Sequence, residues 1–379
     1  MEANAPSAAV DLARQLIRFD TRSSLSNLPA VEYLAAELRD FQVETLDYRD
    51  AAGVTKGVLV AHRGAGSGPC VALSGHLDTV PPLNWQRNPF DPALEDGWLY
   101  GLGSTDMKGP VAAAIAAARR VTTCDVLLLL TADEEVTKAG ARHLAAHSQL
   151  LRSHPPAGIV VVEPTELCCV RGHRARIELT VEPNGHQAHS ATGQGRNANW
   201  DLIPFLSVAR EIHWRLRRDP AFQDPAYDPP WCDLNLVIDN FGTAVNITPA
   251  RAVAQVKLRH SRAVDLEPAV AELQAAAAAH NLAVSLLRDG QAPELAVDHP
   301  LVQAGAAVAG RPPQVVGYGT DASELAAVAP CIVMGPGTIA HAHRPEERIA
   351  VAELEAAVPA LQEVVEGYAR AVETRGELQ

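Results

Sequence analysis

The sequence is poor in aromatic residues and has no long hydrophobic run, and each shortage excludes a class of protein. Aromatic residues make up only 4% of the 379 residues, yet hydrophobic residues reach 47%, which is ordinary for a globular chain and too high for a disordered one. The longest aliphatic run, VLLLL at 126–130, is far shorter than the roughly 20 residues that a helix needs to span a bilayer. We therefore expect a folded chain with its own core and no membrane partner.

Positively charged residues are scarce as well. Lys and Arg number 32 against 45 Asp and Glu, which leaves a net charge of −13. Nucleic-acid binding depends on clustered Lys and Arg that displace counterions from phosphates. We therefore expect no nucleic-acid partner.

The cysteine pattern and the N-terminal stretch both bear on location. The six cysteines include no C-x-x-C pair, and this scattered usage is typical of a reducing compartment. The stretch MEANAPSAAVDLARQLIRF carries early acidic residues and no apolar core of seven or more residues, so it lacks the features of a secretory signal. Both observations predict a cytoplasmic protein.

The predicted secondary structure changes from one pattern to another along the chain. Short apolar runs near Val60 and Leu128 alternate with Ala-rich helical patterns, which predicts an α/β fold with a mostly parallel sheet sandwiched by helices. Within 174–289 the order becomes strand, helix, strand, strand, helix, strand, the order of a ferredoxin-like α+β sandwich. After residue 289 the alternation of strands and helices resumes, and it ends in a helix predicted over about 351–372. We predict one domain from residues 1–173 and 290–379, with a smaller domain at 174–289 inserted into it.

A first pair of polar residues ends a predicted strand in ALSGHLDTVPP. His76 and Asp78 stand at positions i and i+2, so both side chains point to one side of the strand. In a doubly wound sheet, that carboxyl edge is where ligands bind. A zinc ligand with a carboxylate that holds its tautomer fits this pair, and so does a hydrogen-bonded structural histidine.

Acidic residues occupy three comparable places. Asp106 in LYGLGSTDMKG precedes a predicted helix, and taken alone it is more simply interpreted as an N-cap. Glu134 and Glu135 in TADEE, and Glu163 in VVEPTE, end apolar strands. Adjacent carboxylates at such places repel each other and are costly to desolvate, so a purely structural role does not explain them.

A final motif, GPGTIAHAHRPEE, adds His341 and His343 in a loop. Polar groups that converge at one sheet edge are the usual signature of a functional site, and the combined His, Asp and Glu set suits two divalent metal ions. The H-E-x-x-H motif of zincins, the G-x-S-x-G motif of serine hydrolases and a dinucleotide-binding fingerprint are absent.

In this order the motifs GHLDTVP, YGLGSTDMKG, TADEE, EPT, GHQAHS and HRPEE resemble a family of dizinc metallohydrolases. The family includes acetylornithine deacetylase, succinyl-diaminopimelate desuccinylase, aminoacylase and glutamate carboxypeptidases, and the resemblance covers nearly the whole chain. It implies a zinc-exopeptidase-like catalytic domain with an inserted lid that also forms a dimer.

The resemblance also implies a metal centre. One Zn²⁺ would be held by His76, Asp106 and Glu163, and a second by Asp106, Glu135 and His343, with Asp106 shared. Co²⁺ and Mn²⁺ are alternatives, because these ligands accept several divalent ions. Two ions about 3.5 Å apart can share a water and lower its pKa.

Two acidic residues would support this centre. By the resemblance Asp78 would orient His76, and Glu134 would be the general base that moves a proton from water to the departing amine. His341 has no counterpart in the family and is interpreted as a polar surface residue.

In the inserted domain, the resemblance implies that His189 of GHQAHS reaches the active site of the partner subunit in a homodimer and helps to hold the oxyanion. Gly242, Asn246 and Arg259 fall where the lid meets substrate in relatives. Arg259 is a candidate clamp for a substrate carboxylate, or else an arginine that closes an exposed strand.

The sequence differs from the motifs usual in the family at three places: 172–175 lacks a second Gly, AHSATG lacks a second Ser, and Glu346 replaces the usual Asp. None of these differences removes an implied metal ligand. Leu102 stands where the desuccinylase usually has Arg, which favours deacetylation of N-acetylornithine to ornithine and acetate. Other small N-acyl amino acids (acetylcitrulline, succinyl-diaminopimelate, a carrier-bound lysine), a dipeptide, or a noncatalytic binding role on the same fold remain the alternatives.

Overall fold

The computed structural model describes residues 7–64 and 68–376, so the first six residues of the N-terminal stretch considered above lie outside the described part. The chain forms two compact units. The first comprises Met1–Gly172, Pro293–Val315 and Thr320–Gln379, and the second comprises His173–Ala292 and Val316–Gly319.

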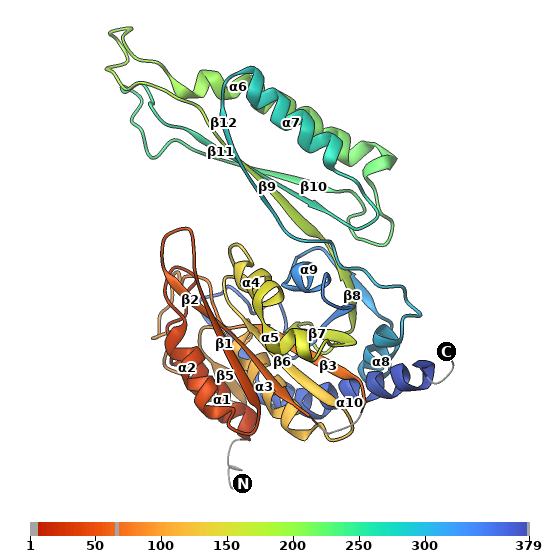
Figure 1. The fold of residues 1–379 in the computed structure, drawn as a ribbon. Coiled ribbons are helices and arrows are strands. Elements are labelled where there is room, and N and C mark those ends of the chain that lie inside the picture. Colours follow the sequence, from red (N-terminus) through yellow and green to blue (C-terminus); the bar gives the residue numbers. More distant parts are fainter. Residues whose placement is uncertain (1–6, 65–67, 377–379) are drawn as a thin grey trace. The chain divides into compact units, whose positions relative to one another are not determined.

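The first unit is built around a mixed sheet with the strand order β1-β2-β6-β3-β7-β14-β8-β13 (Figure 1). A smaller sheet has the order β15-β5-β4. In chain order the elements are α1 (Ala8–Ile17), α2 (Leu28–Glu37), β1 (Gln42–Arg49), β2 (Thr55–Arg63), β3 (Cys70–His76), β4 (Ala93–Glu95), β5 (Trp98–Tyr100), α3 (Lys108–Arg120), β6 (Asp125–Thr131), α4 (Ala139–His147), α5 (Gln149–Ser153), β7 (Gly158–Pro164), β8 (Val170–His173), α8 (Pro300–Ala309), β13 (Gln314–Val316), α9 (Ala322–Leu325), β14 (Cys331–Gly335), β15 (Arg348–Ala350) and α10 (Val351–Gly376).

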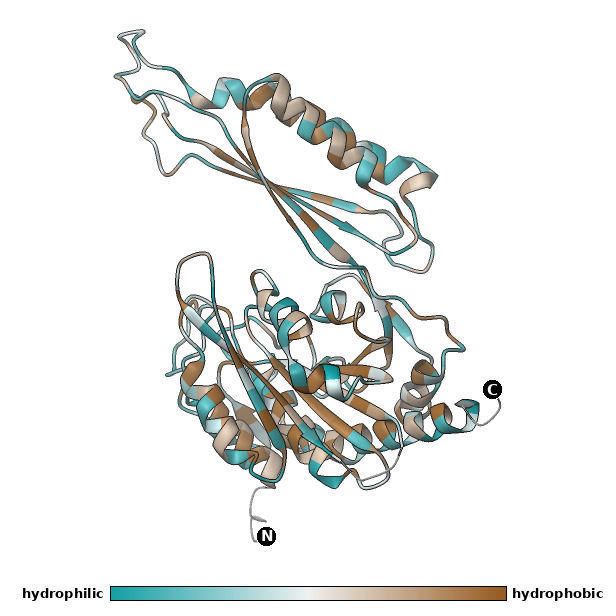
Figure 2. Ribbon diagram, in the orientation of Figure 1, coloured by the Kyte–Doolittle hydropathy of each residue, from teal (hydrophilic) through white to brown (hydrophobic). Residues whose placement is uncertain are grey.

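The central strands of the large sheet are buried on both faces, which explains their continuous apolar sequences. Along β6, Leu128 and Leu130 face the core formed with α1, α3 and α10, whereas Leu127 and Leu129 face the opposite side, where α4 and α5 pack against β2. Figure 2 shows these strands as the most hydrophobic part of the unit. Strands β6, β3, β7 and β14 run parallel, and antiparallel strands flank them. The predicted mostly parallel sheet between helices is confirmed.

The second unit is an antiparallel sheet with the order β10-β11-β9-β12 and two helices. Its elements are β9 (Ala175–Glu182), α6 (Ala198–Arg218), a 3₁₀ turn (Pro220–Phe222), β10 (Asp233–Asp239), β11 (Val253–His260), α7 (Glu267–Ala279) and β12 (Ala283–Arg288). Apolar residues of α6 and α7 form one core with alternate residues of the strands. Element order and pairing confirm the predicted ferredoxin-like fold.

The parallel arrangement decides where polar side chains can meet in the first unit. Strands β3, β6 and β7 are hydrogen-bonded neighbours that all run in the same direction. Their carboxyl ends therefore share one edge of the sheet, and His76, the turn after Thr131 and Glu163 all lie there.

The helices and the cysteines bear on the predictions about membranes and disulfides. Within 7–64 and 68–376, no helix is both long and apolar enough to cross a membrane. All six cysteines are buried and none forms a disulfide.

Candidate metal centre

His76 is the innermost histidine of the predicted site. It ends β3 with 1% of its surface exposed. Its Nε2 lies 3.1 Å from Asp106 Oδ1 and 3.8 Å from Glu163 Oε1. Its Nδ1 lies 2.9 Å from the backbone oxygen of Asp78, a contact in which a protonated Nδ1 donates and Nε2 stays free for a ligand.

A second histidine approaches the same carboxylate from the C-terminal part of the chain. His343 Nε2 lies 3.3 Å from Asp106 Oδ2 and 3.1 Å from Glu135 Oε1. Its side chain is 51% exposed, whereas those of Asp106 and Glu135 are 8% exposed. His343 therefore marks the side of the site that is open to solvent.

Asp106 stands between the two histidines, with one carboxylate oxygen near each. This geometry matches a shared ligand, because each oxygen is directed to a different group. The donor atoms of His76, Asp106 and Glu135 lie within 4.8 Å of one another, and so do those of His76, Glu134 and Glu163. Distance alone thus does not separate Glu134 from the ligands, and its role as a base remains a prediction.

Carboxylates are crowded at this edge of the sheet, and their pKa values are shifted in different directions. Burial raises the pKa of Glu163 well above its usual range, and the nearby Asp106 raises it further. Burial and Asp106 likewise raise the pKa of Glu135 to about 8. Burial also works to raise the pKa of Asp106, but hydrogen bonds from His343 and His76 outweigh it and lower that pKa. Crowded carboxylates beside imidazoles form a donor set that fits divalent metal ions.

Asp78 contacts both His76 and the turn that follows β6. Its Oδ1 lies 3.6 Å from His76 Nδ1, and the same oxygen accepts a hydrogen bond from the backbone N–H of Glu134 at 3.1 Å. Its Oδ2 accepts hydrogen bonds from Ser23 Oγ at 2.7 Å and from the backbone N–H of Glu135 at 3.4 Å. Asp78 therefore holds the turn that carries both glutamates.

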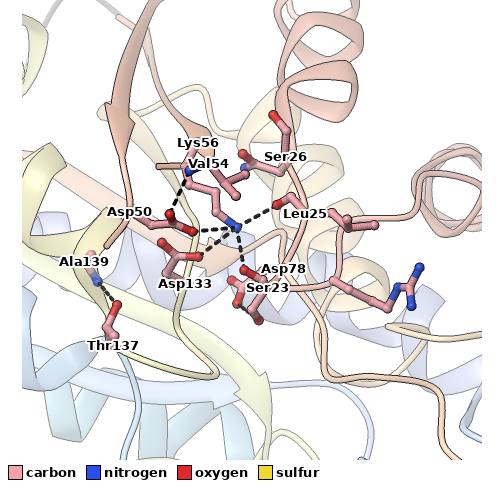
Figure 3. Close-up of polar contacts among 12 residues, drawn as sticks. Ser23, Leu25, Ser26, Asp50, Val54, Lys56, Asp78, Asp133, Thr137 and Ala139 are labelled. Carbon is pink, nitrogen blue, oxygen red and sulfur yellow. Dashed lines mark hydrogen bonds and ion pairs between the residues drawn. The ribbon is translucent and has the colours of Figure 1, made fainter. Parts of the chain in front are cut away.

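A buried lysine that sequence reasoning missed extends this network (Figure 3). The Lys56 side chain is 1% exposed and forms an ion pair with Asp133 at 3.3 Å. Its Nζ also donates to the backbone oxygens of Ser23 at 2.5 Å and Leu25 at 2.6 Å. Through Ser23, which bonds to Asp78, this cation is linked to the turn that follows β6.

Glu347 is a second residue that the sequence did not reveal. Its carboxylate is buried and accepts hydrogen bonds from the backbone N–H groups of Gly103 at 3.0 Å, Thr105 at 2.9 Å and Asp106 at 2.9 Å. Burial raises its pKa to about 7. Glu347 thus fixes the turn that presents Asp106, although it lies 241 residues away in the chain.

The remaining predicted residues belong to the second unit. His189 and Asn246 are exposed and adjacent, because His189 forms an isolated bridge with Ile247 and Ser190 N–H donates to the Asn246 oxygen at 3.0 Å. Gly242 has a φ of +65° in the turn after β10, where a residue without a Cβ is favoured. Arg259 lies on β11 between Asp233 and Arg176 of the neighbouring strands.

His341, which the motifs left outside the site, forms an edge-to-face pair with Trp98, with the ring centroids 5.4 Å apart. None of the metal-centre contacts described above involves it.

Known proteins resemble this chain over most of its length. The profile of peptidase family M20/M25/M40 matches residues 72–367. The acetylornithine deacetylase of Proteus mirabilis (strain HI4320) is 31% identical over 95% of this chain and 96% of its own. The acetylornithine deacetylase of Myxococcus xanthus is 30% identical over 90% and 92%, respectively.

Solved structures agree at the level of the fold. An M20 family metallo-carboxypeptidase from Sulfolobus solfataricus superposes with a TM-score of 0.75 over 96% of this chain and 99% of that chain, at 16% identity. The resemblance inferred from the motifs is therefore confirmed: the chain is a metallohydrolase of peptidase family M20/M25/M40.

Proposed function

We propose that the chain hydrolyses the amide bond of an N-acyl amino acid, with N-acetylornithine as the leading substrate and ornithine and acetate as products. The observation that carries the proposal is the position of Asp106, whose two oxygens lie 3.1 Å and 3.3 Å from two different histidines. The named activity of relatives that are 30–31% identical supports the choice of substrate. The reaction would belong to cytoplasmic arginine biosynthesis, and the unpaired cysteines fit that location.

Two divalent ions, Zn²⁺ first and Co²⁺ or Mn²⁺ as alternatives, would complete the site. His76, Asp106 and Glu163 would hold one ion, and Asp106, Glu135 and His343 the other. When bound, such a pair polarises the acyl oxygen and lowers the pKa of a shared water. Three protein ligands for each ion leave positions open, as in catalytic rather than structural sites.

Glu134 would move the proton. It accepts a proton as a water oxygen forms a bond to the amide carbon, and it delivers that proton to the nitrogen as the carbon–nitrogen bond breaks. Burial raises the pKa of Glu134, which makes its carboxylate a stronger proton acceptor in the first step. Asp78 would position Glu134 by accepting a hydrogen bond from the backbone N–H of Glu134, and it would help to orient His76.

The second unit would provide substrate contacts. We assign His189 to the oxyanion, in the active site of a partner subunit, and Gly242, Asn246 and Arg259 to the amino-acid part of the substrate. A homodimer formed through this unit fits the surface of β10. Leu236, Val237 and Ile238 on this edge strand are 37%, 50% and 48% exposed, and an exposed apolar edge strand is a site for pairing with another chain.

Turnover of a substrate panel by metal-reconstituted protein tests the proposal. The panel holds N-acetylornithine, N-acetylcitrulline, N-succinyl-diaminopimelate, a carrier-bound lysine and dipeptides. We expect the highest kcat/KM for N-acetylornithine, and loss of activity when a chelator removes the metal. A higher kcat/KM for another member would make that compound the proposed substrate in place of N-acetylornithine. If the protein hydrolyses no member of the panel although metal is shown to be bound, the proposed hydrolase activity is refuted and a noncatalytic binding role is favoured.

A further inference from the structure

Two histidines and one aspartate of the first unit form a cluster that the proposed reaction does not use. The nitrogens of His62 and His154 and a carboxylate oxygen of Asp125 lie within 4.8 Å of one another. His62 Nε2 lies 3.1 Å from Asp125 Oδ2, and the rings of His62 and His154 are stacked with centroids 3.6 Å apart and planes 17° from parallel. Three metal-ligating side chains thus come together from three segments of the chain.

The fold explains why these side chains meet. Along β2, Leu59 and Ala61 face the core with α3, so the alternation of side chains directs His62 to the other face. Asp125 begins β6 and shares the face of Leu127, which pairs with His62 across the two strands. On this face α5 packs against β2, and His154 follows the last residue of α5 directly.

The cluster lies at the opposite edge of the sheet from the metal centre. Asp125 is the first residue of β6, and Thr131, the last, precedes the turn with Glu134 and Glu135. With a rise of about 3.3 Å per residue from Asp125 to Thr131, the two ends of this strand are roughly 20 Å apart. The two groups of ligands therefore cannot share an ion.

We propose that His62, Asp125 and His154 form a site for a single transition-metal ion that is separate from the catalytic pair. Ligand atoms at 2.0–2.1 Å from a tetrahedral Zn²⁺ are about 3.3 Å apart, and the 3.1 Å between His62 and Asp125 is close to that spacing. The His154 ring stacks on that of His62, so it would turn about its side-chain bonds to direct a nitrogen at the same ion. Two imidazoles and one carboxylate select Zn²⁺, Co²⁺, Ni²⁺ or Cu²⁺ over Mg²⁺ and Ca²⁺, which prefer oxygen ligands.

Burial and local backbone favour the site as well. His62 is 9% exposed, and the Asp125 side chain is 22% exposed, so the ligands are held by surrounding structure but remain accessible to an ion. Pro155 and Pro156 follow His154. A residue before proline is disfavoured in the helical conformation, and His154 accordingly leaves the helix with φ −128° and ψ 65°.

Metal content measured on untagged full-length protein tests this site. Wild-type protein, Asp125→Asn, His154→Gln and the double variant His62→Gln/His154→Gln are loaded with excess Zn²⁺ and dialysed against buffer with low free Zn²⁺. The matched control is His280→Gln, which changes an exposed histidine at the end of α7 in the second unit. Elemental analysis then gives the number of ions per chain.

We expect the double variant to hold one ion fewer per chain than the wild-type protein, and His280→Gln to hold the wild-type number. The result is a difference, so it does not depend on how many ions the catalytic centre retains or on which substrate is cleaved. The double variant should keep the circular dichroism spectrum of the wild-type protein, which shows that it is folded. Equal metal content in wild-type and double-variant protein, or the same loss in His280→Gln, would overturn the proposal.

Discussion

At the residue scale, Glu134 and Glu135 have the same side chain but different surroundings. Glu135 Oε1 lies 3.1 Å from His343 Nε2. A carboxylate oxygen of Glu134 instead lies within 4.8 Å of the ligand atoms of His76 and Glu163. Burial raises the pKa of both carboxyls. Both glutamates lie in the turn after β6 rather than on the strand, and their different neighbours would let one act as a ligand and the other as a base.

We predict that Glu134→Gln keeps both metal ions but loses about 10²- to 10⁴-fold in kcat, the range for a positioned general base. Glu135→Gln should lose one ion, because a neutral amide is a poorer ligand than a carboxylate. Elemental analysis and steady-state kinetics on the two variants check this division. If Glu134→Gln lost an ion while Glu135→Gln kept both, the two roles would be exchanged.

At the scale of elements, the turn before α3 depends on a carboxylate supplied from just before β15. Glu347 accepts three backbone hydrogen bonds there, including the one from Asp106. In Glu347→Gln the amide group directs an N–H₂ donor at a backbone donor, so at least one of these bonds is lost. We expect a loss of about 10- to 100-fold in metal affinity, as for other residues that orient a metal ligand.

Metal titration of the purified variant measures this effect. Glu346→Gln is the matched control, because Glu346 is the adjacent residue and is exposed. Its metal affinity should equal that of the wild-type protein. Unchanged affinity in Glu347→Gln would mean that the turn holds Asp106 in place without this carboxylate.

Lys56 joins strand β2 to the segment before α2 and to the turn after β6. Its ammonium group is buried with Asp133, which also accepts a hydrogen bond from Tyr48 at 2.7 Å. Lys56→Met would leave Asp133 without its cation and the oxygens of Ser23 and Leu25 without this donor. Removal of one partner from a buried ion pair costs about 3–5 kcal/mol, so we predict a loss of that size in the free energy of unfolding.

Urea unfolding of Lys56→Met and of a control variant measures the loss in the free energy of unfolding. Asp50→Asn serves as the control, because Asp50 lies 3.8 Å from Lys56 Nζ and its side chain is 19% exposed. This change should cost less than about 1 kcal/mol. If both substitutions lowered the free energy of unfolding by the same amount, the ion pair with Asp133 would contribute no more to stability than the longer contact with Asp50.

At the scale of the whole molecule, the proposed dimer makes His189 act in the site of the partner subunit. Inactive Glu134→Ala and inactive His189→Ala proteins are mixed under conditions that exchange subunits. In a mixed dimer one site lacks both groups, and the other has an intact Glu134 and receives an intact His189. Random pairing makes half of the dimers mixed, so activity should approach about a quarter of the wild-type level.

Action of His189 within its own subunit predicts no recovery in this mixture. Activity that stays at the level of the separate variants, after subunit exchange has been verified by mass, would rule out the role in the partner subunit. The exposed position of His189 would then be that of an ordinary loop histidine.

Most of the fold could be predicted from local patterns. The alternation in ARIELTVE and the helical period of 198–218 depend only on neighbouring residues, and the β-α-β-β-α-β order follows from them. The carboxyl ends of apolar strands similarly pointed to His76 and Glu163 as site residues. Such patterns are readable because each element buries one face or both against a core.

Ser23, Lys56 and Glu347 could not be found in this way. Their partners lie 55, 33 and 241 residues away along the chain, and nothing local distinguishes them from surface residues of the same type. The cluster of His62, Asp125 and His154 has the same origin, since its members belong to no common motif. Only the pairing of β2 with β6 and the packing of α5 bring them together.

The sequence by itself determined the class of the fold, the order of its elements and the kind of chemistry, because periodicity and short motifs are properties of neighbouring residues. Tertiary structure decided which carboxylate oxygen of Asp106 faces which histidine, and which buried groups hold the turns that carry Asp106 and Glu134. These contacts join residues far apart in the chain, and they exist only after the strands have paired in register and the helices have packed on the sheet.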